Sequence, residues 1–138
     1  MKSIKHCECC GAKIVEYKHL LNKGLVSALY QLSLNEDPVP LTDLMISRNQ
    51  WTNFQKLRYW GLVAKETTAE GYGTGRWLIT AIGRDFVEGR TAMPLNAWTF
   101  RGETIRIDGP NITFRDVFTE NYRKRKDYAA DNQVHIGV

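Results

Sequence analysis

The three cysteines of the chain stand within four positions, at Cys7, Cys9 and Cys10, and the rest of the sequence has none. A disulfide framework would spread its cysteines along the chain, whereas clustered thiolates are preferred ligands of a structural zinc ion. Gly11 follows directly and allows a sharp turn in which backbone N–H groups can point at a thiolate. The spacing therefore predicts one structural Zn²⁺ ion at the amino-terminal end.

A structural zinc site has four ligands, and the sequence offers more than one set. Our preferred ligands are Cys7, Cys9, Cys10 and His19, with His6 as an alternative to Cys9. The C-x-x-C-G unit resembles the knuckle of a zinc ribbon, although the second C-x-x-C of a complete ribbon is absent. Free thiols, or a redox pair formed by Cys7 and Cys10, are the alternatives to metal binding.

The stretch after the cysteines has the periodicity of helices. Apolar residues recur at helical spacing at Leu21, Leu25, Leu29 and Leu32. This pattern predicts a helix over residues 23–34 with Asn22 as its N-cap, and the prolines at positions 38 and 40 end it. A short second helix is expected over residues 43–46, with Thr42 as its N-cap.

A third helix is predicted over residues 48–59, after the N-cap Ser47 and before Gly61. We expect Trp51, Phe54 and Leu57 to form its buried face. No Asp or Glu occurs between Ser47 and Lys65, so nothing on this helix repels phosphates. Amide and cationic side chains can read base edges in the major groove. The candidate DNA contacts on this helix are Arg48, Asn49, Gln50, Asn53 and Lys56, with Asn49, Asn53 and Lys56 on one face.

A hairpin and a fourth helix follow. Residues 62–66 and 76–80 read as strands joined by a long glycine-rich loop over 67–75. Thr80 or Ala81 begins a helix that carries Ile82 and Phe86 and ends near Gly89. Tyr72 and Arg76 are the candidate phosphate contacts of the hairpin, although Glu70 adds a negative charge near its tip.

The order of these elements resembles the winged helix-turn-helix family, particularly its MarR-like type. The resemblance covers residues 22–90 and is carried by Leu57–Val63, as the exit from a recognition helix, and by Trp77–Phe86, as the return strand and following helix. It implies that the third helix enters the major groove of double-stranded DNA and that the hairpin, the wing, lies near the backbone.

The carboxy-terminal third contains a second predicted hairpin, over residues 98–117, with its turn at Asp108-Gly109-Pro110. A run of four cations comes next, and it could lie on DNA phosphates or form a solvated tail. These candidate DNA contacts are Arg123, Lys124, Arg125 and Lys126.

The composition is that of a globular protein: 43% of the 138 residues are hydrophobic, enough for a core without disulfides. We therefore predict an α+β fold with a winged-helix core. It divides into a zinc-knuckle arm (1–20), the winged helix (21–92), a β-hairpin extension (93–120) and a basic tail (121–138). No stretch reaches the length of a membrane helix and no signal peptide is visible, so a cytoplasmic location is expected. Catalytic motifs such as H-E-x-x-H are absent, so no enzyme is expected.

Two functions fit these patterns. The first is a sequence-specific double-stranded DNA-binding protein, a small transcriptional regulator, and the acid-free third helix favours it. The second is a protein-binding adaptor or inhibitor, of the kind carried by phages or mobile elements, that grips a host polymerase or replication protein. Glu70 on the wing and the added hairpin favour the second function. Either function is compatible with a homodimer.

Overall fold

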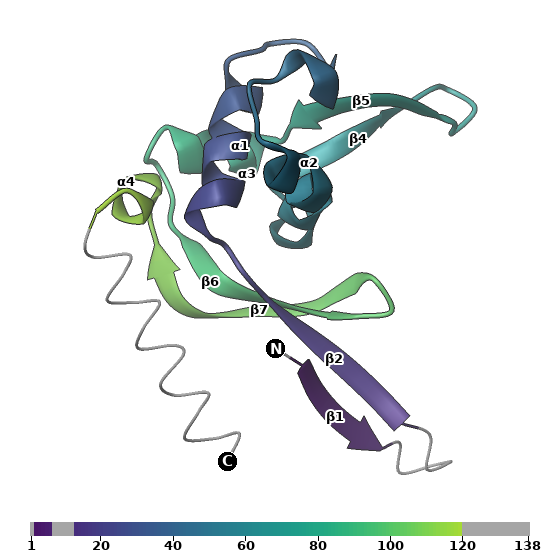
Figure 1. Cartoon of the computed structure of the whole chain (residues 1–138), viewed down its shortest axis with the longest axis vertical. Helices are drawn as coiled ribbons and strands as arrows, with labels where there is room; N and C mark the ends of the chain where they lie inside the picture. Colours follow the sequence, from purple (N-terminus) through teal and green to yellow (C-terminus); the bar gives the residue numbers. More distant parts are fainter. Residues whose placement is uncertain (1, 7–12, 120–138) are drawn as a thin grey trace.

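Two antiparallel sheets and a group of short helices form the part of the chain that this computed structural model describes, residues 2–6 and 13–119 (Figure 1). This confirms the predicted α+β class. None of the helices within these residues is both long and apolar enough to span a bilayer.

The larger sheet joins the two ends of the described chain. Its strands are β1 (Lys2–His6), β2 (Lys13–Leu20), β6 (Met93–Phe100) and β7 (Glu103–Ile112), in the order β1-β2-β6-β7. β2 pairs with β6 from Tyr17–Thr99 to Leu20–Asn96. The arm and the hairpin extension, predicted as separate appendages, therefore share one sheet.

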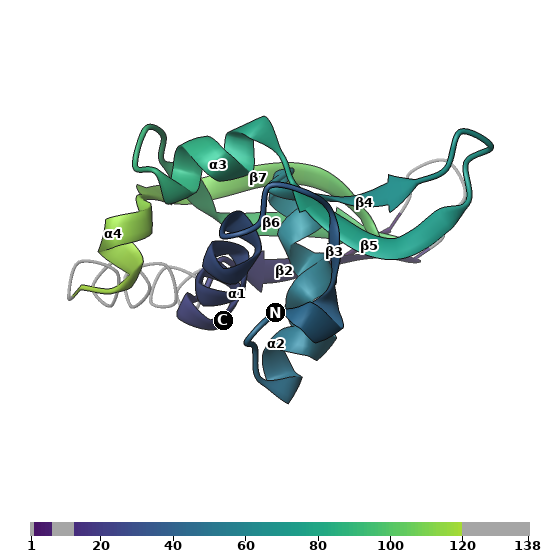
Figure 2. The ribbon, with the colours of Figure 1, turned by 90° about the horizontal axis from the view of Figure 1, so that it is seen from above.

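The middle of the chain forms the helices and the smaller sheet. Its elements are α1 (Lys23–Ser33), β3 (Val39–Pro40), η1 (Leu41–Asp43), α2 (Arg48–Asn53), η2 (Phe54–Trp60), β4 (Val63–Thr67), β5 (Gly73–Ile79) and α3 (Ala81–Val87). The smaller sheet has the order β3-β5-β4. A last short helix, α4 (Phe114–Val117), follows β7. Figure 2 shows the β4–β5 hairpin extending away from α1 and α3.

Local capping signals place the starts of three helices where the sequence predicts them. The side chains of Asn22, Ser47 and Thr80 accept hydrogen bonds from backbone N–H groups of the first turns of α1, α2 and α3. Gly61 ends η2 with φ 74°, a conformation that glycine adopts without steric cost. These boundaries are confirmed.

The second and third helices differ from the prediction. Instead of a helix after Thr42, a single 3₁₀ turn spans residues 41–43, because Leu44 leaves the turn in an extended conformation. The third helix is α-helical only to Asn53 and continues as the 3₁₀ helix η2. Residues three apart align in a 3₁₀ helix, so Phe54, Leu57 and Trp60 share the buried face of η2. Trp51 precedes this segment and is 46% exposed, so its predicted burial is wrong.

The predicted turn at residues 108–110 is also wrong. The β6–β7 hairpin turns at Arg101 and Gly102, which have φ values of 51° and 80°, as a tight two-residue connection requires. Asp108, Gly109 and Pro110 lie within β7. Gly109 has φ 93°, and a Cβ there would overlap the side-chain amide of Asn96. The β4–β5 loop is likewise shorter than predicted, since β4 extends to Thr67 and β5 begins at Gly73.

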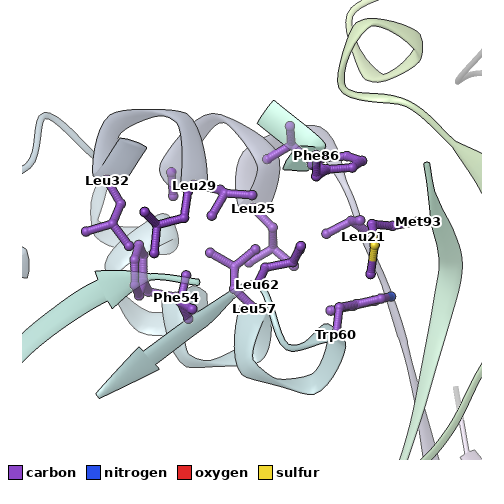
Figure 3. Packing of buried hydrophobic residues seen from close by; sticks show 14 of the residues in the cluster. Leu21, Leu25, Leu29, Leu32, Phe54, Leu57, Trp60, Leu62, Phe86 and Met93 are labelled. Atoms are coloured by element: carbon purple, nitrogen blue, oxygen red, sulfur yellow. The ribbon is translucent and has the colours of Figure 1, made fainter. Parts of the chain in front are cut away.

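One hydrophobic core connects the helices with both sheets (Figure 3). Its buried residues include Leu21, Leu25, Leu29, Leu32, Phe54, Leu57, Trp60, Leu62, Phe86, Met93 and Leu95. Ile82, which we expected in this core, is 50% exposed. The neighbouring Gly83 packs closely against the backbone of Leu62 instead. A Cβ at Gly83 would overlap the Leu62 carbonyl oxygen, so this close contact requires glycine.

Candidate nucleic-acid interface

Several of the predicted DNA contacts lie on α2 and η2, and the outer side of these two helices is polar and exposed. Arg48, Asn49 and Gln55 are exposed, and their side chains make no hydrogen bond within the described chain. We call these three residues the polar face. Thr52 is also exposed, and its hydroxyl donates to the carbonyl oxygen of Arg48 at 3.0 Å. Figure 2 shows α2 at the edge of the molecule, away from α3.

Gln50 has a different position, because its side chain is already used inside the fold. Its Oε1 accepts from the backbone N–H of Ser47 at 2.7 Å, which completes a capping box. Its Nε2 donates to the carbonyl oxygen of Gly24 at 2.9 Å and joins α2 to the start of α1. The structure therefore gives this predicted base contact a structural role.

Asn53 and Lys56 are half-buried and do not share the exposure of Asn49. The Asn53 Nδ2 donates to the Asn49 carbonyl oxygen at 2.9 Å. Asn53 also borders a small hollow, lined with Asn49 and Gln50 and, at the start of α1, with the N-cap Asn22, Gly24 and Leu25. Asn53 and Lys56 thus lie closer to the neighbouring elements, and Asn49 is the one residue of the predicted stripe that is exposed.

Lys56 lies on the side of η2 that faces the larger sheet. Burial, and then the positive charge of Lys56, lower the pKa of His19 below its usual value. The His19 Nε2 lies 3.0 Å from the Thr99 Oγ1, and its ring contacts the Tyr59 ring with centroids 4.8 Å apart and planes tilted by 39°. His19 is therefore part of the contact between β2 and η2.

Trp51 is a surface residue that the sequence patterns did not reveal. It lines an open hollow at the start of α2 together with Ile46, Ser47, Arg48 and Thr52. Met45, two positions before Ser47, is 86% exposed. Tryptophan, arginine and methionine are enriched in protein interfaces, so this end of α2 offers apolar as well as polar contact area.

The β4–β5 hairpin presents a largely neutralised surface. Tyr72 is 72% exposed near its tip, as a contact residue should be. Arg76 forms an ion pair with Glu66, and Thr74 donates its hydroxyl to the same carboxylate at 2.9 Å. The Lys65 ammonium lies 5.3 Å from the centre of the Trp77 ring. Arg76 thus has an internal partner that a phosphate would have to replace.

Only the histidines among the predicted zinc ligands, His6 and His19, lie within the described residues. Cys7, Cys9 and Cys10 lie outside the described residues. His6 pairs with Lys13 at the end of the β1–β2 ladder. His19 stands six positions beyond Lys13 along β2, which is about 20 Å at the usual strand rise. Within residues 2–6 and 13–119 no three potential ligands converge as a metal site would require.

The basic run Arg123, Lys124, Arg125 and Lys126 also lies outside the described part of the chain. No family model matches the sequence, and neither the curated proteins nor the solved structures gave a match. Function is therefore inferred from the surface of the chain itself.

Proposed function

We propose that the protein binds double-stranded DNA sequence-specifically, with α2 in the major groove. The observation that carries this proposal is the polar face, Arg48, Asn49 and Gln55, on a helical segment without any acid from residue 48 to residue 64. Arginine can donate two hydrogen bonds to guanine, and an Asn or Gln amide can pair with adenine in the same groove. A surface of this kind would meet bases without repelling the backbone.

The topology supports a winged-helix arrangement. Along the chain, α1 is followed by the short strand β3, the turn η1, the segment α2–η2, the hairpin β4–β5 and α3. β3 pairs with β5, so the second hairpin strand occupies the centre of a three-stranded sheet. This order agrees with the resemblance in residues 22–90, in which the helix before the hairpin reads the groove.

Selection of bound sequences from random duplexes, followed by binding of two variants, tests the proposal. Gln55→Ala should relax the preference at one base pair, at a cost of about 1–3 kcal/mol. Arg48→Ala should weaken binding, whereas Arg115→Ala, which removes an exposed arginine of α4, should not. The DNA proposal fails if no sequence is enriched, or if Arg48→Ala and Gln55→Ala both bind the selected duplex like the parent.

A protein-binding adaptor is the second candidate, and the hollow beside Trp51 favours it. The exposed Met45 and Trp51 could anchor an apolar side chain of a partner next to Arg48. Trp51→Ala would then abolish partner binding, whereas a protein that binds only DNA would keep most of its DNA affinity in this variant. Enrichment of one protein but no DNA sequence, together with loss of that protein on Trp51→Ala, would favour this function.

We also propose that one structural zinc ion is bound by Cys7, Cys9 and Cys10. The pairing of His6 with Lys13 supports His6 as the fourth ligand, because it stands next to the cysteine segment in sequence and register. The distance along β2 and the contacts of His19 do not support His19. Freshly purified protein should contain one zinc per chain, and His6→Ala should release it more readily than His19→Ala. Protein that never binds zinc would contradict this proposal.

A further inference from the structure

The strand β7 ends the larger sheet and leaves one edge without a partner among the described strands. It is ten residues long, and all residues from Glu103 to Gly109 are exposed. Such an edge presents backbone N–H and C=O groups that can pair with another strand. Ile105 and Ile107 add apolar side chains that are 45% and 40% exposed.

The charges of this edge alternate with its apolar residues. Arg106 and Asp108 flank Ile107, and the Arg106 Nε lies 3.4 Å from the Asp108 Oδ2. Arg106 also pairs with Glu16 at 3.3 Å and lies over the ring of Trp98. The Asp108 Oδ1 accepts from the Asn96 side-chain amide at 3.2 Å and from the Trp98 indole N–H at 3.0 Å. The side chains of Arg106 and Asp108 are nevertheless 40% and 46% exposed.

We propose that two copies of the chain form a dimer in which β7 pairs antiparallel with β7 of the second copy about a two-fold axis at Ile107. Residues at equal distances from such an axis lie opposite each other. Arg106 of one copy would then face Asp108 of the other, twice, and the two Ile107 side chains would touch. Opposite charges and apolar residues in facing positions stabilise antiparallel pairs.

Other positions of the axis are less favourable. An axis at Arg106 would place two arginines opposite each other, and an axis at Asp108 would do the same with two aspartates. An axis at Ile105 would pair no opposite charges. The two register shifts between β6 and β7, near Ile105 and near Gly109, also lie at equal distances from Ile107. Of these four axes, the one at Ile107 is the only one that places opposite charges face to face.

Charged residues and bulges usually prevent pairing at exposed edges. In β7 they match their own copies, so they would select this one partner rather than exclude all partners. The interface is small, and we therefore expect a weak dimer. Dimer formation through β7 does not require the proposed DNA binding.

Sedimentation equilibrium of the full chain, over about 1–300 µM to bracket a weak interface, tests the dimer. Ile107→Asp should raise the dissociation constant about tenfold or more, because two carboxylates would face each other at the axis. Ile82→Asp, an equally large change at an exposed isoleucine of α3, should leave it unchanged. A chain that stays monomeric over the whole range, or a dimer that Ile107→Asp does not weaken, would overturn the proposal.

A thiol at the axis tests the register. In Ile107→Cys the introduced thiols would face each other at about 5 Å between Cα atoms, within the range of a disulfide. In Ile105→Cys they would stand four positions apart, about 13 Å, and should not join. Peptide mapping by mass spectrometry identifies the linked pair despite the native cysteines. Equal linkage in both variants, or none at position 107, would contradict the proposed axis.

Discussion

Gln50 shows how one side chain of α2 serves the fold while its neighbours stay available. It closes the capping box with Ser47 and joins α2 to the Gly24 carbonyl of α1. Arg48 and Asn49, two and one positions earlier, have no such contacts within the described chain. The sequence alone lists all three as base contacts, because the partner of Gln50 lies 26 positions away.

Gln50→Ala should lower the free energy of unfolding by about 1–2 kcal/mol, because it removes the Gln50 half of the capping box and a partly buried hydrogen bond to Gly24. Asn49→Ala is the matched control and should change stability by no more than about 0.5 kcal/mol. Urea denaturation of the two variants measures both values. If Asn49→Ala costs as much as Gln50→Ala, the structural role of Gln50 is not supported.

His19 should make the protein less stable as the pH falls. Its pKa is lowered in the folded chain, first by burial and then by the charge of Lys56, relative to an ordinary value of 6.5. Between these two pKa values the unfolded chain binds more protons, so the free energy of unfolding decreases with decreasing pH and is constant above the ordinary pKa.

Urea titrations between pH 5 and pH 8 for the parent and His19→Gln measure this effect. The stability of the variant should depend less on pH, because it lacks the proton that the His19 ring takes up on unfolding. His6 and His135 are unchanged in both proteins and cancel in the comparison. A His19 ring that does not titrate, and whose NMR signals shift when zinc is removed, would instead favour His19 as a ligand.

The ends of helices that depend on residues a few positions away could be predicted from the sequence. Asn22, Ser47 and Thr80 start helices because their side chains bond to N–H groups three residues later. Gly61 ends η2 for an equally local reason. The resulting order of helices and β4–β5 strands could therefore be predicted before the structure was known.

Contacts between distant segments explain the errors. The turn signal in Asp108-Gly109-Pro110 is strong, but β6 pairs across it and Arg101–Gly102 forms the turn instead. The pairing of β2 with β6 joins residues about 80 positions apart, and no local pattern indicates it. Trp51 has helical spacing to Phe54, yet the change to a 3₁₀ helix leaves it outside the core. In the candidate site, the residue types were predictable and their exposure was not.

Gly83 sets the distance between α3 and the start of β4. A Cβ at this position would overlap both the Leu62 carbonyl oxygen and the Ile79 side chain. Gly83→Ala should therefore destabilise the fold by about 1–3 kcal/mol. Gly73→Ala, in open space on β5, should have an effect within about 0.5 kcal/mol. Thermal melts compare the two, and equal midpoints would show that α3 does not depend on this close contact.

At the scale of the whole molecule, the larger sheet and the helices share one core. Leu95 of β6 and Leu21 before α1 are fully buried in the same cluster as Phe54. The indole N–H of Trp60 donates to the Pro94 carbonyl oxygen at 2.9 Å, and the Thr104 hydroxyl donates to that of Tyr59 at 3.0 Å. The sheet thus supports η2 directly, and through it the polar face.

We therefore expect one cooperative unfolding transition for the helices and the larger sheet. Leu95→Ala should lower the stability of both parts by about 2–5 kcal/mol, because it leaves a cavity in the shared core. Amide hydrogen exchange should show the loss equally in α1 and in β6, while Ile105→Ala at the exposed edge changes neither. Loss of protection in β6 alone would indicate two independent units.

Contact between the polar face and base edges of double-stranded DNA can be observed by NMR titration of the ¹⁵N-labelled chain with a duplex obtained by selection. The side-chain amide signals of Asn49 and Gln55 and the guanidinium signal of Arg48 should shift most, while the Gln50 amide keeps its shift. Binding should also weaken when guanine N7 in the major groove is replaced by carbon. Shifts confined to other surfaces, with the polar face unchanged at saturation, would contradict base contact by the polar face.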